Sequence, residues 1–165
     1  AAALQRLRQF MRSLDLNNEL GEPDIKIAGL SIWLHQRQFP EADDYDDANW
    51  LIITACCKAS GAVVWINGPI IHLSEIYRLL KGCEQMSDSL SGAAELGCME
   101  PELALKLKML KNGQMEMDVE ISPDHLTQTH QFRFDIDQSY LPNLIRDCRQ
   151  TLDKYPIKPD RSETE

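Results

Sequence analysis

The sequence lacks the features that would place the protein in a membrane or on nucleic acid. No stretch approaches the roughly 20 apolar residues that a membrane-spanning helix needs, and no secretory signal pattern opens the chain. Positive charge is scarce, since 17 Lys and Arg residues stand against 26 Asp and Glu residues, for a net charge of -9. Binding to phosphates requires a basic face. We therefore expect no direct nucleic-acid binding and no membrane partner, whereas a basic protein would be attracted.

The common catalytic motifs are also missing. The chain has no GxGxxG or GxxxxGK(S/T) phosphate-binding loop, no HExxH zinc motif and no GxSxG nucleophile elbow. Its four histidines, His35, His72, His125 and His130, show no close metal-ligand spacing, so we expect each to be structural or exposed. We predict that the protein is not an enzyme and uses no cofactor and no metal ion.

Cysteine is present, but without the pattern of a disulfide framework or a metal site. The five cysteines contain no CxxC pair, and their number is odd. Most lie among apolar residues, where cysteine behaves as a small hydrophobic side chain. A reduced, cytoplasmic protein is the economical interpretation. The adjacent Cys56 and Cys57 could form a redox pair, but neighbouring strand residues point to opposite faces, so we expect a structural role.

Length and composition are those of one globular domain. With 165 residues, of which 43% are hydrophobic, the chain can bury a core without disulfides or a structural metal. We expect residues 25–157 to form this domain. Residues 1–20 are predicted to contain an amphipathic helix and a linker, because apolar residues recur at helical spacing from Leu4 to Leu14. Residues 158–165 are predicted to form a disordered tail.

Periodic patterns predict an α+β fold. Strands are predicted at 25–34, 50–57, 62–66, 103–109, 115–121 and 132–136, and helices at 74–83 and 141–152. Ser74 and Ser139 are the expected helix N-caps. Gly29 should mark a bulge or bend, and residues 87–97 should be a loop. The short connections favour a mainly antiparallel sheet of about six to seven strands with two helices packed on it, plus the N-terminal helix. The almost wholly apolar run 50–57 should be a central strand covered on both faces.

The clearest local structure is a hairpin around Asn112-Gly113. A two-residue loop would place an apolar residue opposite a charge, with Met109 facing Glu116. A three-residue loop, Lys111–Gly113, sets Met109 opposite Met115 and keeps apolar residues on one face. We therefore predict the three-residue loop, with Gly113 in the left-handed conformation. The polar face of this hairpin is a second candidate surface for a partner, with side chains from Lys106, Lys108, Glu116 and Asp118.

The most unusual segment is a run of negative charge next to the most apolar strand. Residues 41–47 carry five carboxylates and no base, shortly before Trp50. As a calcium site the run offers alternate oxygen ligands, but it lacks the glycine and the final glutamate of an EF-hand loop. As a catalytic pair, two carboxylates would need surroundings that separate their pKa values. The other interpretations are a solvated loop that protects a sheet edge and a binding surface for a basic partner.

A series of short motifs runs through residues 25–157. The longest is Asp-Asp-Ala-Asn-Trp-Leu at 46–51, and the others lie at 38–40, 43–44, 68–69, 73–75, 100–103 and 152–156. In this order the motifs resemble those of WapI-type immunity proteins, which are encoded beside polymorphic toxins of the WapA and Rhs kind. One departure is Arg37, which stands where the family usually has an aromatic residue.

The resemblance implies a cytoplasmic immunity protein, or antitoxin, that binds the C-terminal toxin domain of its own locus. Binding would block the active or substrate-binding surface of the toxin and protect the producing bacterium. Such toxins are frequently nucleases with a basic cleft, where carboxylates can take the place of phosphates. The expected partner-binding residues are Glu41, Asp43, Asp44, Asp46 and Asp47, and the expected structural signature is Phe39, Pro40, Asn49, Trp50 and Leu51. The alternative is a small calcium-binding or hydrolytic module that uses the same Asp-rich loop with His35 or His72.

Overall fold

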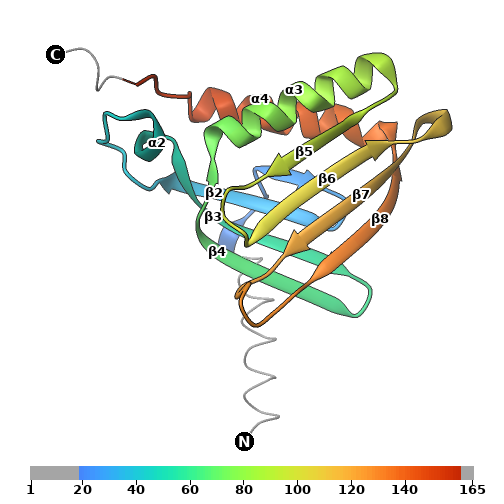
Figure 1. The fold of residues 1–165 in the computed structure, drawn as a ribbon, viewed down its shortest axis with the longest axis horizontal. Coiled ribbons are helices and arrows are strands. Elements are labelled where there is room, and N and C mark those ends of the chain that lie inside the picture. The colour runs from blue at the N-terminus through green and yellow to red at the C-terminus, as the bar shows by residue number, and fades with distance from the viewer. Residues whose placement is uncertain (1–18, 161–165) are drawn as a thin grey trace, which may run out of the picture.

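The computed structural model describes residues 19–160, so the predicted N-terminal helix and the end of the predicted tail lie outside the described residues. Within this range the chain forms one α+β domain with two four-stranded antiparallel sheets and two main helices (Figure 1). The predicted class and antiparallel pairing are confirmed, but the prediction of a single larger sheet is wrong. A long helix separates the fourth strand from the fifth, and each sheet pairs only strands that follow one another in the chain.

The first sheet contains β1 (Ile25–Ile27), β2 (Leu30–Arg37), β3 (Trp50–Ala59) and β4 (Ala62–His72), in that order. The predicted strand 25–34 is therefore two strands, and the expected bend at Gly29 is a complete reversal of the chain. Glycine is required at this turn because β3 comes very close. A Cβ on Gly29 would lie 2.1 Å from the carbonyl oxygen of Lys58.

β3 is a central strand that is buried on both faces, as predicted. On its inner face Leu51, Ile53 and Ala55 have no exposed surface. Cys56, on the opposite face, is also fully buried. On that face Trp33 and Trp65, from the two neighbouring strands, stack with ring centroids 5.7 Å apart.

The second sheet contains β5 (Ala93–Gly97), β6 (Leu103–Met109), β7 (Gln114–Ile121) and β8 (Gln131–Asp137), in that order. The predicted register of the β6–β7 hairpin is confirmed, with Met109 opposite Met115 and Lys108 opposite Glu116. The loop η1 (Lys111–Gly113) has the predicted three residues, and Gly113 has the predicted positive φ of 74°.

β5 lies where the sequence predicts a loop. Its residues are mostly small, and only Ala94 and Leu96 are buried. Small size is needed because α3 (Leu73–Ser89) packs closely on this strand. A Cβ on Gly82 of α3 would lie 2.7 Å from the Cβ of Ala94.

Both predicted helices are present, but their predicted N-caps are wrong. His72 caps α3, because its ring accepts a hydrogen bond from the Ser74 N–H and Glu75 bonds back to the His72 N–H. Ser139 lies within a short 3-10 turn, η2 (Gln138–Tyr140), which precedes α4 (Leu141–Lys154). None of the helices among residues 19–160 combines the length and the hydrophobicity of a membrane-spanning helix.

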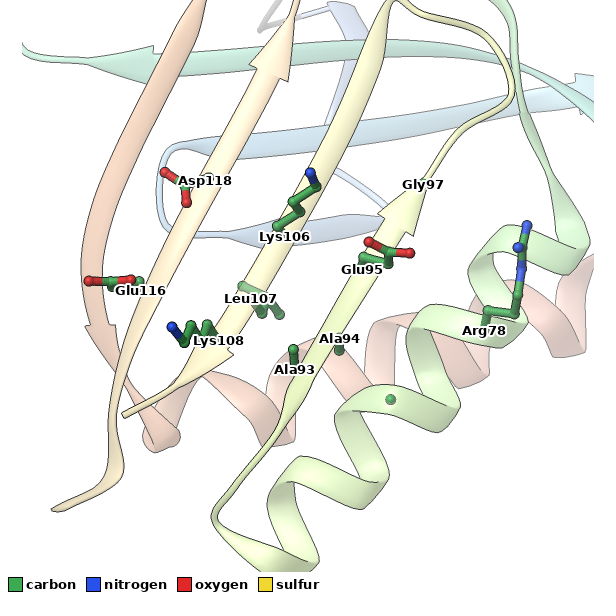
Figure 2. Close-up of a pocket in the computed structure, with 11 residues that line it drawn as sticks. Arg78, Ala93, Ala94, Glu95, Gly97, Lys106, Leu107, Lys108, Glu116 and Asp118 are labelled. Atoms are coloured by element: carbon green, nitrogen blue, oxygen red, sulfur yellow. The ribbon is translucent and has the colours of Figure 1, made fainter. Parts of the chain in front are cut away.

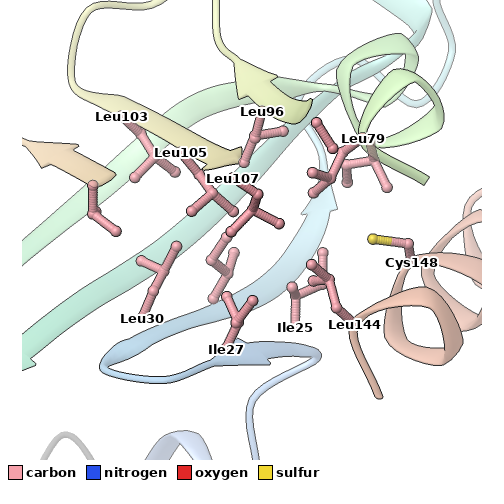
Figure 3. Close-up of a cluster of buried hydrophobic side chains, with 14 of the residues drawn as sticks. Ile25, Ile27, Leu30, Leu79, Leu96, Leu103, Leu105, Leu107, Leu144 and Cys148 are labelled. Carbon is pink, nitrogen blue, oxygen red and sulfur yellow. The ribbon is translucent and has the colours of Figure 1, made fainter. Parts of the chain in front are cut away.

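One buried cluster joins both sheets and both helices (Figure 3). Leucines of β6, isoleucines of β1 and the inward faces of the two helices meet in it. α3 packs on β5 and on α4, and α4 packs on β1, so the two helices lie together along one side of the sheets (Figure 1). The connection between β2 and β3 lies at one end of this assembly, where it carries the acidic residues.

Candidate partner-binding site

The acidic segment, residues 41–47, connects β2 to β3 and contains the start of the short helix α2 (Tyr45–Ala48). Asp44 is the N-cap of α2, and its Oδ1 accepts a hydrogen bond of 2.8 Å from the Asp47 N–H. Asp46 and Asp47 lie in the first turn, where negative charge is favoured by the helix dipole. The local sequence therefore explains why this loop begins a helix.

The structure brings all five predicted partner-binding carboxylates together on this one connection. Glu41, Asp43, Asp46 and Asp47 are exposed, and Asp44 is half-buried. Among residues 19–160, Asp44 is the only one of the five whose side chain makes a hydrogen bond. The other four carboxylates are therefore available to solvent or to a partner.

The buried side chain of Asn49 anchors the acidic segment through hydrogen bonds. It is 0% exposed, and its Nδ2 donates to the carbonyl oxygens of Tyr45 at 2.8 Å and Lys158 at 2.9 Å. Its Oδ1 accepts from the Lys158 N–H at 2.8 Å and from Arg37 at 3.3 Å. The Asn49 backbone carbonyl accepts from the Leu73 N–H at 3.0 Å, which joins the segment to the start of α3. Asn49 thus joins α2, α3 and the C-terminal residues.

The residues after α4 form a C-terminal strap, defined here as residues 156–158, which is held from two sides. Arg37 donates through Nη1 to the Ala48 carbonyl at 2.6 Å and through Nη2 to the Pro156 carbonyl. Lys158 Nζ donates to the Pro40 carbonyl at the other end of the acidic segment. Partial burial lowers the pKa of the Arg37 guanidinium, which still remains charged at neutral pH.

Sequence reasoning missed the roles of Arg37 and the strap. In the sequence, Arg37 stands out only as a departure from the family pattern, and Pro156 only as the end of the motif at 152–156. The available signal was the position of Arg37 at the end of an apolar strand, where a charged fork needs several acceptors. Its partner in the strap, Pro156, lies 119 residues further along the chain, which local patterns do not reach.

The expected structural signature residues occupy different environments. Asn49 and Leu51 are fully buried, and Trp50 is half-buried. Phe39 is 46% exposed and Pro40 is also exposed. The exposed Phe39 ring precedes the acidic segment and gives this surface an apolar side chain next to its charges.

Trp50 belongs to an aromatic group around His72. The Trp50 and His72 rings meet edge to face at 5.4 Å, and Tyr45 contacts the same imidazole at 5.4 Å. Because His72 is also the N-cap of α3, this group ties α2 to the beginning of that helix. The His72 ring is buried and serves as a cap and a packing surface.

The other histidines are dispersed. His35 bonds through Nε2 to Thr54 Oγ1 at 2.8 Å, His125 lies 3.7 Å from Glu102, and His130 contacts a nearby glutamine. Among residues 19–160, no group of three or more His, Cys, Asp or Glu side chains could hold a metal ion.

All five cysteines are free. Burial raises the pKa of Cys56 to about 11 and the pKa of both Cys57 and Cys83 to about 12. Burial also raises the pKa of Cys98 and Cys148. These thiols are protonated near neutral pH, so the Cys56–Cys57 pair lacks the thiolate that redox chemistry requires.

The polar face of the second sheet is the other candidate surface. Lys106 and Lys108 of β6 lie beside Glu116 and Asp118 of β7 over a hollow of about 460 Å³ (Figure 2). Arg133 of β8 makes an ion pair of 2.8 Å with Asp118, which lowers the pKa of that carboxyl group. The two signs of charge alternate on this face, so it has no strong preference for a basic or an acidic partner.

Two solved structures resemble the fold. The crystal structure of WHY3 from Arabidopsis thaliana matches with a TM-score of 0.42 and 13% identity, over 81% of this chain and 85% of that one. The plant transcriptional regulator PBF-2 matches with a TM-score of 0.43 and 10% identity, over 78% of this chain and 75% of that one. At these values the similarity carries no information on function.

Sequence comparison is more decisive. No curated protein sequence matches the chain. One family model does match, the immunity protein WapI-like family, and it covers residues 22–156, from before β1 to the beginning of the C-terminal strap. This range includes the acidic segment, Asn49 and Arg37. The chain belongs to the immunity protein WapI-like family.

Proposed function

We propose that this protein binds the C-terminal toxin domain encoded at its own locus and neutralises it by covering the active or substrate-binding surface of the toxin. Family membership across residues 22–156 is the observation that carries the proposal. The net charge of -9 supports a basic partner, because opposite charge steers two proteins together over long range. The protein acts in the cytoplasm of the producing bacterium and performs no catalysis.

The acidic segment is the proposed centre of the binding surface. Four of its carboxylates are exposed and free of internal hydrogen bonds within the described residues. Arginine and lysine side chains of a nuclease cleft would pair with them as they pair with phosphates. The backbone beneath is already held by Asn49 and the C-terminal strap, so little ordering of this segment is needed on binding.

Co-expression tests the function directly. Cells that produce the toxin domain of the same locus should stop growing, and this protein should restore their growth. A toxin domain of the same family from an unrelated locus serves as the specificity control and should remain toxic. If cells die equally fast with and without this protein, the proposed function is wrong.

Association kinetics test the acidic segment. Changing Glu41, Asp43, Asp44, Asp46 and Asp47 to their amides takes the net charge from -9 to -4, since five negative charges are removed. We expect association with the toxin domain to slow by about tenfold or more at low salt, and the salt dependence to weaken.

A matched variant separates local from overall charge. It carries the same five-charge change on α3 and the second sheet, at Asp88, Glu95, Glu116, Glu120 and Asp135. It should slow association much less than the acidic-segment variant. Equal slowing by both would show that only net charge matters, and slowing by the matched variant alone would move the interface to the second sheet.

A further inference from the structure

A pocket of about 490 Å³ lies between the middle of β4 and the two loops that flank β6 and β7. Trp65, Asn67 and Pro69 of β4 form one side, and Glu100 and Glu102 form the other. Among the residues that the structure describes, no lysine or arginine lines it. The pocket therefore combines a concave shape, an aromatic ring and two carboxylates.

Two of the family-like motifs meet in this pocket. Gly68-Pro69 and the stretch 100–103 are more than 30 residues apart in the sequence, yet both contribute lining residues. The register of β3 and β4 shifts beside Pro69, which interrupts the regular ladder at this point. On the side of the pocket opposite Pro69, the Ser122 N–H donates to the Glu102 carbonyl at 2.9 Å, which fixes the backbone at Glu102. Neither motif has a part in the acidic segment described above.

The pocket residues also leave hydrogen-bonding capacity unused. Glu102 Oε2 and Trp65 Nε1 are shielded from solvent, and neither has a hydrogen-bond partner among residues 19–160. The other carboxylate oxygen, Glu102 Oε1, lies 3.7 Å from His125 Nδ1. An unpaired buried oxygen is unfavourable, and the terminal carboxylate torsion of glutamate is soft. Rotation about this torsion would therefore let Oε2 reach a donor that enters the pocket.

We propose that this pocket is a second contact site for the toxin, which receives an arginine or lysine side chain from a basic loop of that partner. The cation donates to Glu102 and is further attracted by Glu100, while the Trp65 ring forms the opposite wall of the pocket. The proposal rests on the proposed function and adds to it a site that is separate from the acidic segment. A side chain held in a concave site is the usual form of an interface anchor.

The test compares single substitutions in the full-length protein by their affinity for the purified toxin domain. Glu102→Gln removes the negative charge and preserves the shape, and it should weaken binding by about tenfold to a hundredfold. Trp65→Phe shortens the aromatic wall of the pocket and retains a ring beside Trp33, and it should weaken binding by about fivefold. Asp88→Asn removes one charge near the C-terminal end of α3, about 22 Å along the helix from its first residue, and it should change affinity less than twofold.

Thermal unfolding of each variant completes the experiment. Glu102 Oε2 has no partner to lose among the described residues, so Glu102→Gln should unfold at or above the wild-type temperature. Weaker binding with retained stability supports the pocket. If the wild-type protein neutralises the toxin but Glu102→Gln and Trp65→Phe bind as tightly as the wild type, the pocket proposal is wrong and the proposed function stands. If the wild-type protein does not bind the toxin at all, both are wrong.

Discussion

Replacing Asn49 by alanine should destabilise the protein far more than its place in a surface connection suggests. The side chain takes part in four hydrogen bonds, three of them between 2.8 and 2.9 Å and the fourth, from Arg37, at 3.3 Å. At about 1 kcal/mol net for each good bond, the loss is about 3 kcal/mol. Lys158 is half-buried, so water reaches the freed groups of the strap and limits the additional penalty. A protein of this size should then unfold about 6 to 12 °C lower.

Urea unfolding followed by circular dichroism measures this change. The midpoint should fall while the slope with denaturant stays constant. Asn67→Ala is the matched control, because Asn67 is exposed and its side chain makes one bond, to Thr54 Oγ1 at 2.9 Å. That control should cost less than about 1 kcal/mol. If Asn49→Ala lies within about 0.5 kcal/mol of the wild type, the reasoning about this residue is refuted.

A double-mutant cycle identifies which contacts carry the effect. Ending the chain after Tyr155 removes the C-terminal strap, and with it two of the four Asn49 bonds. In that shortened chain, Asn49→Ala should cost about 2 kcal/mol less than in the full chain. A cost that is the same in both chains would show that Asn49 stabilises the protein independently of the strap.

Three further predictions concern the interior. Because burial raises the pKa of Cys56 to about 11 and of Cys57 and Cys83 to about 12, a thiol reagent at pH 8 should label the native protein slowly and the unfolded protein rapidly. As pH rises above 9, these thiols ionise in the unfolded chain while they stay protonated in the folded protein, so the free energy of unfolding should fall. Cys83→Ala should reduce that fall. Gly82→Ala should destabilise the protein by about 1 to 3 kcal/mol in urea unfolding, although alanine is the better helix former, because its Cβ would lie 2.7 Å from the Cβ of Ala94. Fast native labelling, or a stable Gly82→Ala variant, would contradict the packing described for these sites.

The β6–β7 hairpin was predictable from sequence because its information is local. Met109, Gly113 and Met115 lie within seven residues, and a slip of one position would have turned every apolar side chain outward. β5 was not predictable in this way, because its alternation rests on Ala94 and Leu96 alone. Its small residues are explained only by the helix that packs against it, which the sequence of the strand does not reveal.

The candidate site shows the same contrast. The charge of the acidic segment is a local property that the sequence reveals directly, whereas the cap at Asp44 and the short helix α2 were not predicted, because the segment was expected to be a loop. The contacts of Asn49 with Lys158 join residues 109 positions apart and depend on the complete fold. The predicted N-cap of α3 was wrong for a related reason. Ser74 is the better local cap, but the ring of His72 is held in the capping position by Trp50 and Tyr45.

In the acidic segment, the residues that hold the backbone are different from the residues that present the charges. This division affects how such proteins can diverge. The path of the chain is held by Asn49 and by the strap, and within the described residues only Asp44 among the five carboxylates bonds to the segment itself. Substitutions at the other four positions should therefore cost little folding stability, and in the proposed interface they would alter what the surface recognises. Duplicated copies of such a gene could exchange these side chains freely and acquire new toxins as partners while the scaffold stays the same.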